Sequence, residues 1–510
     1  MLLLKAAVID LGFNSVKMVC YNVDQQSGSF RPFRQDSFRA KLGEGLDEAG
    51  FLGAAQMQRT LDYVKILSEI AALESIDRIL PIATSAVREA SNGQQFVKSV
   101  FAETGLTFKV LSAADEALYS YVGAMRFASV PDVVFFDLGG GSLEVVRALG
   151  SRIRSVMSLP VGVLRLSLRY RNGKGSFSRR QSRLMKKTIL HVLPRGEDLQ
   201  VSRRTRLVGV GGTVRAIARR DQENSSYPFT KIQSYAIPYR AVSSISKSFL
   251  KMTKKELSNE REIGNRAETI TAGTLVVKML MKSLGVEELT VSAHGLREGA
   301  LAMYLGDTKL FHASSVSTND VERFLSESTS ESKYYAEGYS LTLERAGLVD
   351  RREASLLGET LRVVTRVTPS VNLMGLFYSV LEEESEVSRH DQLMMASIVV
   401  TARNDRVAEL IVRQYGHVLG RKDMEDVKRL AAFYSFIEIL NGTGATLRAS
   451  RHGSELWVKI IEGRARLPAS LLSHNAETIS EALGIRLNLT FSTTGSTLLA
   501  AGRGDRDHRL

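Results

Sequence analysis

Two short segments of the sequence place an aspartate at the end of an apolar run and follow it with glycine and small polar residues. The first, AVIDLGFNS at residues 7–15, contains Asp10, Gly12, Asn14 and Ser15. The pattern predicts a strand, a tight turn and a returning strand. Glycine lets backbone amides approach an anion, and a hydroxyl adds a donor. The aspartate can hold a divalent cation or a water bound to it.

The second segment, VVFFDLGGGSLEVV at residues 133–146, repeats this arrangement with more glycines. Its polar and glycine positions are Asp137, Gly139, Gly140, Gly141, Ser142 and Glu144. A single loop of this kind would be ordinary for a hairpin. Because each of the two loops opens its own segment, they predict two phosphate-binding hairpins that face each other across a cleft.

Length and composition limit the class of protein. With 510 residues, of which 44% are hydrophobic and 24% charged, the chain should form several globular domains. No apolar run approaches the roughly 20 residues that cross a bilayer. A single cysteine, Cys20, excludes an internal disulfide framework and suits a reducing compartment. We therefore expect a cytoplasmic protein without a membrane partner.

The net charge of +13 favours a polyanionic partner. The basic residues gather in the middle third of the sequence, in clusters at residues 179–187, 203–206, 215–220 and 251–255. Each cluster alone is typical of a solvated helix face. Zinc-finger, basic-zipper and aromatic–basic RNA patterns are missing from the sequence, which argues against nucleic acid. The basic surface alone does not distinguish nucleic acid from another phosphate polymer.

Strand and helix patterns divide the chain into five parts. Residues 1–126 and 127–306 each begin with a hairpin and continue with helices and strands, which predicts two similar α/β domains. Residues 307–320 are polar and irregular and predict a linker. Residues 321–444 are helical in pattern throughout. Residues 445–510 return to short strands around a helix and end in a tail that we expect to be disordered.

Three further positions carry chemistry or bind anions in this pattern. Glu116 lies in the first turn of a helix predicted from residue 113, where capping by Ser112 is the alternative role. Arg88 follows a predicted strand and has an alternative role as a surface residue. A strand also leads into the turn Gly211-Gly212-Thr213, which opens a helix.

Together these segments resemble the exopolyphosphatase / guanosine pentaphosphate phosphatase (Ppx/GppA) family. The resemblance rests on six motifs in the family's order, which are the loops at Asp10 and Asp137, ATSAVR at residues 83–88, DEA at residues 115–117, GVGGT at residues 209–213 and GLREG at residues 295–299. It implies an α/β fold with two ribonuclease-H-like domains of the actin and sugar-kinase superfamily. A helical domain similar to His-Asp phosphohydrolases and a small α/β C-terminal region would follow.

The resemblance also implies the roles of individual residues. Glu116 would be the general base on the attacking water, assisted by Asp137 and Glu144 as catalytic carboxylates. Asp10, Asp137 and Glu144 would position Mg²⁺ and its waters. The terminal phosphate would be bound by Gly12, Asn14, Ser15, Arg88, Gly139, Gly140, Gly141, Ser142, Gly211, Gly212 and Thr213.

The sequence departs from the family's pattern at several positions. Phe13 stands where the family usually has serine, so one hydroxyl donor is missing. Ala113 and Asp115 replace the usual glycine and glutamate beside Glu116. The helical region lacks the metal-binding histidines, and we interpret His390-Asp391 as a capping or surface pair, so no second metal centre is expected there.

We therefore predict an Mg²⁺-dependent exopolyphosphatase that releases terminal orthophosphate from inorganic polyphosphate, and we expect a homodimer. A guanosine pentaphosphate 5′-phosphohydrolase is the nearest alternative, because the terminal phosphate is alike in both substrates. A kinase or ATPase of the same superfamily would also need an adenosine pocket. A catalytically silent polyphosphate or nucleotide sensor is a further alternative.

Overall fold

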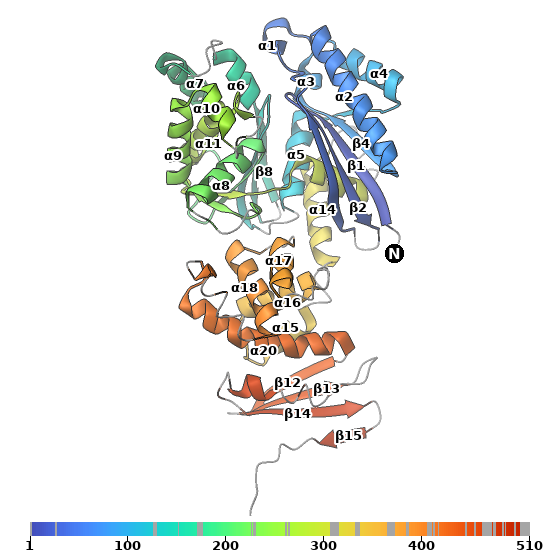
Figure 1. Ribbon diagram of the computed structural model, residues 1–510, viewed down its shortest axis with the longest axis vertical. Coiled ribbons are helices and arrows are strands. Elements are labelled where there is room, and N and C mark those ends of the chain that lie inside the picture. Colours follow the sequence, from blue (N-terminus) through green and yellow to red (C-terminus); the bar gives the residue numbers. More distant parts are fainter. Residues whose placement is uncertain are drawn as a thin grey trace, which may run out of the picture. The chain divides into compact units, whose positions relative to one another are not determined.

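The computed structural model contains two compact units, Met1–Thr329 and Ser330–Leu510, drawn from blue to red in Figure 1. We describe each unit by itself. The structure describes residues 3–25, 28–125, 130–150, 152–170, 177–225, 227, 231–260, 263, 266–306, 316–331, 337–364, 373–383, 387–404, 411, 414–416, 418–443, 446–452, 455–461, 472, 476–481, 484, 486–493 and 496–499.

The first sheet of the first unit is mixed. Its strands lie in the order β3 (Phe30–Phe38), β2 (Val16–Asp24), β1 (Leu3–Leu11), β4 (Arg78–Ala83) and β5 (Lys109–Val110). β1 is antiparallel to β2 and parallel to β4. β1 is buried on both faces, which explains its continuous apolar run in the sequence.

The second sheet repeats this arrangement. Its strands lie in the order β10 (Ala236–Pro238), β11 (Glu288–Val291), β9 (Arg206–Val210), β6 (Asp132–Leu138), β7 (Leu143–Leu149) and β8 (Arg152–Leu159). β6 is antiparallel to β7 and parallel to β9, as β1 is to β2 and β4. The predicted tandem of two similar α/β folds is therefore confirmed.

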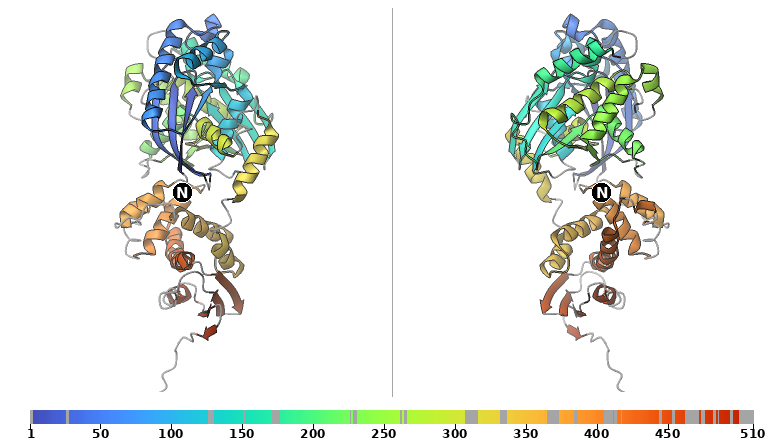
Figure 2. Two further views of the ribbon diagram at one scale, coloured as in Figure 1. Left: turned by 90° about the vertical axis from the view of Figure 1, so that its right-hand side faces the viewer. Right: turned by 90° about the vertical axis from the view of Figure 1, so that its left-hand side faces the viewer.

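Helices cover the outer faces of both sheets (Figures 1 and 2). On the first sheet, Val64, Leu67 and Ala71 are spaced along one face of α2 and are buried in the same core as Ile9 of β1. The outer helices of the first sheet are α1 (Leu46–Ala49), α2 (Ala54–Leu73), α3 (Ser85–Glu89) and α4 (Gly93–Thr104). The outer helices that follow β8 in the chain are α6 (Val163–Tyr170), α7 (Arg179–Val192), α8 (Gly212–Asn224), α9 (Tyr239–Lys251), α10 (Lys254–Asn259) and α11 (Ile270–Leu284).

A pair of helices, α5 (Ala113–Met125) and α12 (Leu296–Gly306), lies between the two sheets. Their backbones meet at glycines, since a Cβ on Gly123 would lie 2.0 Å from the Gly295 carbonyl oxygen and one on Gly299 would lie 1.8 Å from that of Tyr119. One core thus contains side chains from both sheets and both helices. Glycine is required at this crossing because any side chain would separate the helices.

This shared core changes the predicted domain boundaries. The boundary at residue 126 separates the sheets, but α12 belongs to the chain's second half and packs against α5 of the first half. Of the predicted linker, residues 307–315 lie outside the described residues, but Val316 and the following Val321 are buried in the shared core, and α14 (Thr318–Glu331) begins at residue 318. Apolar side chains at these two positions, in an otherwise polar segment, hold α14 to the first unit.

The second unit consists of helices followed by a small sheet. Its helices are α15 (Glu337–Arg345), α16 (Arg351–Val364), α17 (Leu373–Glu382), α18 (Arg389–Thr401) and α20 (Arg421–Thr443). The sheet has the order β12 (Thr446–His452), β13 (Glu455–Ile461), β14 (Arg486–Thr493) and β15 (Ser496–Leu499). The expected helical region and small α/β C-terminal region are both present, whereas the expected disordered tail lies outside the described residues.

Among the described residues, no helix combines the length and the apolar character needed to cross a membrane.

Candidate active site

The two glycine loops adopt the same turn. The amide of Gly12 donates to the carbonyl oxygen of Ser15 at 3.1 Å, and the amide of Gly139 donates to that of Ser142 at 3.0 Å. Within the described part of the chain, the amides between these bonds, at residues 13–15 and 140–142, donate no hydrogen bond. Each loop therefore presents free backbone donors, as an anion-binding turn requires.

Phe13 occupies the back of the first loop. Its ring is buried in the core outside the first sheet. The ring lies so close to Gly43 and Gly141 that a Cβ on either would come within 2.5 Å of it. The guanidinium of Arg165 lies 5.2 Å from the ring centroid. Phe13 therefore joins the two loops by packing where the family's serine would supply a hydroxyl, and its amide is still free.

Glu116 projects from the first turn of α5. Its Oε2 accepts a hydrogen bond from Nη1 of Arg88 at 2.8 Å. Burial raises the pKa of Glu116 to about 7, against the opposing charge and hydrogen bond of Arg88 and with a further increase from Asp137 and Asp10. Ser112 is the cap: its hydroxyl accepts from the amide of Asp115 at 3.0 Å and donates to Oδ2 of Asp115 at 2.8 Å, so the acidic side chain that bonds the cap is Asp115 and not Glu116.

Arg88 was expected to grip the substrate's phosphate oxygens. The structure places it beside the candidate base, where Nη1 donates both to Glu116 and to the carbonyl oxygen of Leu111 at 2.9 Å. Arg88 therefore orients Glu116, and its role toward phosphate oxygens stays a prediction.

Asp137 and Glu144 are cross-strand partners in the second hairpin. Ser120 donates to Oδ2 of Asp137 at 2.7 Å, and Ser158 donates to Oε1 of Glu144 at 3.0 Å. Burial raises the pKa of Asp137, and burial together with the charges of Glu116 and Asp137 raises the pKa of Glu144 well above its ordinary value. The three carboxylates thus form one repelling cluster, which a cation would relieve.

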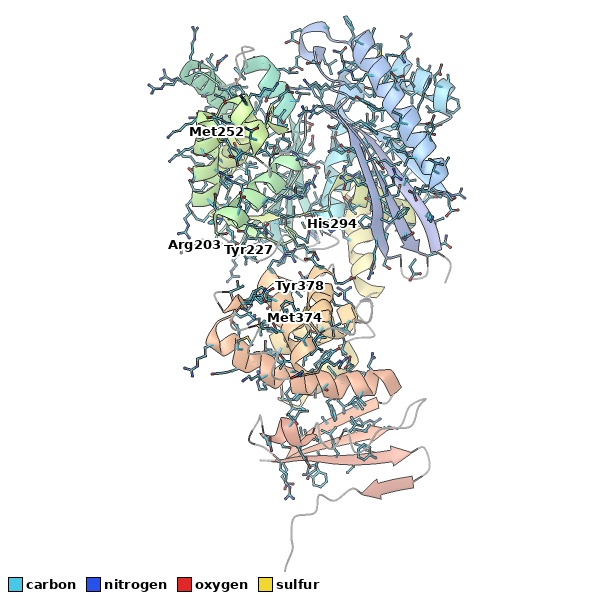
Figure 3. All side chains as sticks on the ribbon, viewed as in Figure 1. Arg203, Tyr227, Met252, His294, Met374 and Tyr378 are labelled. Carbon is cyan, nitrogen blue, oxygen red and sulfur yellow. The ribbon has the colours of Figure 1, made fainter. Side chains whose placement is uncertain are left out.

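Asp10 has a different neighbour. It pairs across the first hairpin with Lys17. Its Oδ2 also lies 3.4 Å from Nη1 of Arg297, at the start of α12. His294, labelled in Figure 3, lies on the loop that leads into this helix. The amide of Gly295 and the hydroxyl of Tyr21 both donate to Glu298, at 2.8 and 2.7 Å, and so fix the turn that carries Arg297.

Sequence reasoning missed the cations that face these carboxylates. Lys17, Arg215, Arg266 and Arg297 interact electrostatically with one another. Burial and the charge of Arg297 lower the pKa of Lys17 to about 8, although Asp10 opposes this change. Burial, followed by Arg297 and Arg266, likewise lowers the pKa of Arg215 to about 10. Repelling cations that are still partly exposed are prepared to bind a polyanion.

Three of these cations had a signal in the sequence, and one of them, Arg215, begins the basic cluster at residues 215–220, two residues after Thr213. Lys17 interrupts an apolar strand directly opposite Asp10, which is unusual unless it faces a polar site. Arg297 lies within the GLREG segment, but no role was assigned to it. Arg266 had no local signal, because only the fold brings it to the Gly211-Gly212 turn.

The glycine turn after β9 makes room for Arg266. Gly211 has a φ of 111°, a conformation that favours glycine. A Cβ on Gly212 would lie 2.4 Å from Nε of Arg266, so this guanidinium lies directly over the turn. Thr213 is buried against Gly273 of α11, so the glycines and Arg266 form the accessible part of the turn.

The residues present suit a hydrated Mg²⁺ better than a directly bound one. No group of three or more His, Cys, Asp or Glu side chains in the described ranges has an arrangement that could hold a metal ion. Yet Oδ1 of Asn14 is buried without a hydrogen-bond partner, and the nearby carboxylates repel one another. Mg²⁺ usually keeps several waters and takes one or two carboxylates plus substrate phosphates. The chemistry of this set therefore fits that ion.

His390 and Asp391 belong to the second unit and are structural. Asp391 bonds to Ser388, the residue that caps α18, at 2.8 Å, and also pairs with Arg352 at 2.7 Å. Nε2 of His390 lies 3.0 Å from Oδ2 of Asp423. The interpretation of this pair as a cap and surface pair agrees with these contacts.

The chain is similar to several characterised proteins. Exopolyphosphatase 2 of Mycobacterium tuberculosis is 27% identical over 320 residues, which cover 59% of this chain and 98% of that protein. Exopolyphosphatase 1 of Mycobacterium bovis is 26% identical over 325 residues, with 62% and 94% covered. The crystal structure of an exopolyphosphatase from Cytophaga hutchinsonii is 21% identical, covers 59% of this chain and 97% of that one, and superposes with a TM-score of 0.54, which shows a shared fold.

The family is shown by a separate comparison. The Ppx/GppA phosphatase family model matches residues 20–307, more than half of the chain, which include Glu116, the second loop and the Gly211-Gly212 turn, whereas the loop at Asp10 precedes the matched range. The chain therefore belongs to the Ppx/GppA phosphatase family.

Proposed function

We propose that the protein is an exopolyphosphatase that hydrolyses the terminal phosphoanhydride bond of inorganic polyphosphate, with Glu116 as general base and Mg²⁺ as cofactor. The observation that carries the proposal is the environment of Glu116. Burial and neighbouring carboxylates raise its pKa to about 7. A base is most effective when its pKa lies near the working pH.

The two loops and the cations support binding of the chain's end. The free amides at residues 13–15 and 140–142 would donate to oxygens of the terminal phosphate. Lys17, Arg215, Arg266 and Arg297 would offset the charge of this and the next phosphate. Positioning and charge neutralisation supply most of the rate in phosphoryl transfer.

Glu116 would accept the proton of the attacking water. The water oxygen forms a bond to the terminal phosphorus while the bridging P–O bond breaks, and the bridging oxygen leaves with the shortened chain. Arg88 holds Glu116 through Oε2, which leaves Oε1 to take the proton. When bound, Mg²⁺ would neutralise phosphate oxygens, and Asp10, Asp137 and Glu144 are the residues that would hold it and its waters.

Phosphate release from long polyphosphate and from guanosine pentaphosphate, each with Mg²⁺ and with EDTA, tests the proposal. We expect Mg²⁺-dependent release that is faster from polyphosphate. Faster release from guanosine pentaphosphate would select the alternative phosphohydrolase. Transfer of phosphate to an added acceptor would indicate a kinase, and binding without release would indicate a sensor.

A further inference from the structure

One carboxylate, Glu268, lies among cations from both halves of the first unit. Its Oε1 lies 2.7 Å from Nζ of Lys254, and its Oε2 lies 3.1 Å from Nζ of Lys41 and 3.5 Å from Nη1 of Arg39. Arg39 and Lys41 follow β3 of the first sheet in the chain, whereas Lys254 and Glu268 follow β10 of the second sheet. The carboxylate is one-fifth exposed, so solvent and solutes reach it.

The backbone places these cations beside the candidate active site. The amide of Lys41 donates to the carbonyl oxygen of Asn14, in the first phosphate loop, at 2.9 Å. Lys41 has a φ of 52°, a left-handed conformation that costs energy for a residue other than glycine. Two residues from Glu268, Arg266 covers the Gly211-Gly212 turn. The cluster therefore adjoins the two elements that border the phosphate site.

A capping box fixes the start of the helix that carries Lys254. Lys254 is the first residue of α10, whose preceding residue, Thr253, forms a capping box with Glu256. The box sets the direction in which the chain enters the helix. Cations from two different elements are thus held around one point, which Glu268 fills, and Glu44 lies farther off, with its Oε1 3.9 Å from Nζ of Lys41.

A carboxylate at such a point resembles a phosphate group in its charge and its acceptors. Both take hydrogen bonds from ammonium and guanidinium groups. Burial opposes the ionisation of Glu268, but Lys254 foremost and Lys41 next hold its pKa down to about 2, so it is charged at any working pH. A polyphosphate chain that runs from the loops past Lys41 must displace Glu268 or be repelled by it.

We infer that Arg39, Lys41 and Lys254 form a further anion subsite for an inner phosphate of an oligophosphate chain, and that Glu268 occupies this subsite as an internal counter-ion when the substrate is absent. The inference rests on the proposed function for its ligand. Glu268 then lowers affinity for every chain long enough to reach the subsite. It favours chains whose charge is sufficient to displace it.

The test is equilibrium binding of end-labelled long polyphosphate, followed by fluorescence anisotropy, to full-length variants that all carry Glu116→Gln to suppress turnover. Adding Glu268→Gln removes the competing charge and keeps the shape. We expect binding to tighten by about threefold to tenfold, the range for a few partly exposed ion pairs. Adding Lys254→Gln to that variant should remove the gain.

Glu288→Gln is the matched control. It changes the net charge equally, but Glu288 pairs with Arg206 at the start of β9, whereas the Gly211-Gly212 turn follows the end of that strand. Unchanged or weaker binding by the Glu268→Gln protein would overturn the inference, as would an equal gain from Glu288→Gln. If Glu268→Gln lowers the melting temperature, Lys254→Gln alone decides: weaker binding supports the subsite, and unchanged binding rejects it.

The outcome is separable from that of the proposed function. Phosphate release by the unmodified protein tests hydrolysis, whereas the binding series tests the subsite. A protein that binds more tightly after Glu268→Gln but releases no phosphate would keep the subsite and lose the exopolyphosphatase assignment. The reverse pattern would keep the enzyme and lose the subsite.

Discussion

The hairpins β1–β2 and β6–β7 share a turn and a cross-strand register but differ in the charge opposite the aspartate. Asp10 pairs with Lys17, whereas Asp137 pairs with Glu144. One scaffold, used twice, thus provides a cationic position on one side and an additional carboxylate on the other. We infer a division of labour, in which the first hairpin attracts phosphate and the second prepares the water and cation.

The difference also appears in the surroundings of each hairpin. On the carboxylate side, burial together with Glu116 and Asp137 raises the pKa of Glu144, and burial together with Asp137 and Asp10 raises that of Glu116 against the opposing effect of Arg88. Lys17 is repelled by Arg297, Arg215 and Arg266 on the cationic side. Each side alone is unfavourable, because like charges are held together, and substrate with its cation would neutralise both. Variants should therefore separate into those that change kcat and those that change KM.

The largest expected effect comes from Glu116→Gln. The amide keeps the shape but cannot accept the proton, so kcat should fall by about 10²–10⁴ while polyphosphate binding persists. Phosphate release and anisotropy measure the two quantities. Glu69→Gln, on the exposed face of α2, is the matched control and should leave kcat unchanged. Activity above half of the unmodified value would reject Glu116 as the base.

Asp137→Asn breaks the carboxylate hairpin without touching the cationic one. A neutral amide is a poorer partner for a hard cation, so activity at fixed Mg²⁺ should fall by about 10- to 100-fold. The Mg²⁺ concentration for half-maximal activity should rise. Asp62→Asn on α2 serves as the control. An unchanged Mg²⁺ titration by a folded variant would make Asp137 structural.

The pH dependence of kcat/KM should show both hairpins at once. Glu116, with a raised pKa of about 7, acts as a base only when ionised, so activity should fall below that pH by about tenfold per unit. Lys17, with a lowered pKa of about 8, loses its charge above that pH, so phosphate binding should weaken there. The profile should therefore be bell-shaped.

Substitutions assign the two limbs. Lys17→Met should lower the maximum and abolish the alkaline limb, and leave the acid limb in place. A profile that rises continuously to pH 9 in the unmodified protein would contradict the role of Lys17. An acid limb displaced to near pH 4 would mean that Glu116 is not buried as described.

The sequence predicted one side of the comparison better than the other. The carboxylates follow apolar runs that end in glycine turns, so their positions could be read from local pattern. The cations come from four distant places, and only the fold brings Lys17, Arg215 and Arg266 together. Their chemistry is a property of tertiary packing, and no local spacing encodes it.

The shared core shows the same limit. The two similar α/β folds follow from the repeated hairpin patterns, and they were predicted correctly. The crossing of α5 and α12 depends on Gly123 and Gly299, which lie far apart in the chain and resemble ordinary helix glycines. Likewise Phe13 suggested only a missing hydroxyl, because its fit against Gly43 and Gly141 is visible only in three dimensions.

The basic clusters of the middle third, which favoured a polyanionic partner, lie in different places. Arg215 lies in the site and Lys254 beside it. Arg203, at the outer edge in Figure 3, belongs to a cluster at the start of β9, whereas the Gly211-Gly212 turn follows the strand's end. Exposed arginines of α7 form a third group. α7 packs against α6, and the amide of Leu164 in α6 donates to the carbonyl oxygen of Gly140, in the second loop, at 2.9 Å.

The smallest expected effect is therefore reversal of the α7 group. Changing Arg179, Arg180 and Arg183 together to Glu should raise KM for long polyphosphate by about tenfold or less at low salt. The effect should be smaller at physiological ionic strength, where exposed charges act only over a Debye length of about 8 Å. The helix should tolerate this change, since acids suit its N-terminus and the cap from Ser178 is kept. KM for guanosine pentaphosphate should change less, because a short substrate cannot extend beyond the cleft.

The matched control changes Arg203, Arg204 and Arg206 to Glu. It alters the net charge by the same amount, but at the start of β9, away from the Gly211-Gly212 turn that follows the strand. If α7 guides the chain, only its reversal should raise KM for long polyphosphate and flatten the dependence on salt. Equal changes from both triple variants would show that net charge alone attracts the polymer. Equal changes for long and short substrates would indicate damage to the cleft, because guidance along α7 requires a chain long enough to reach this helix. In that case α7 would have no part in binding polyphosphate, and the binding function would be limited to the hairpin that carries Lys17.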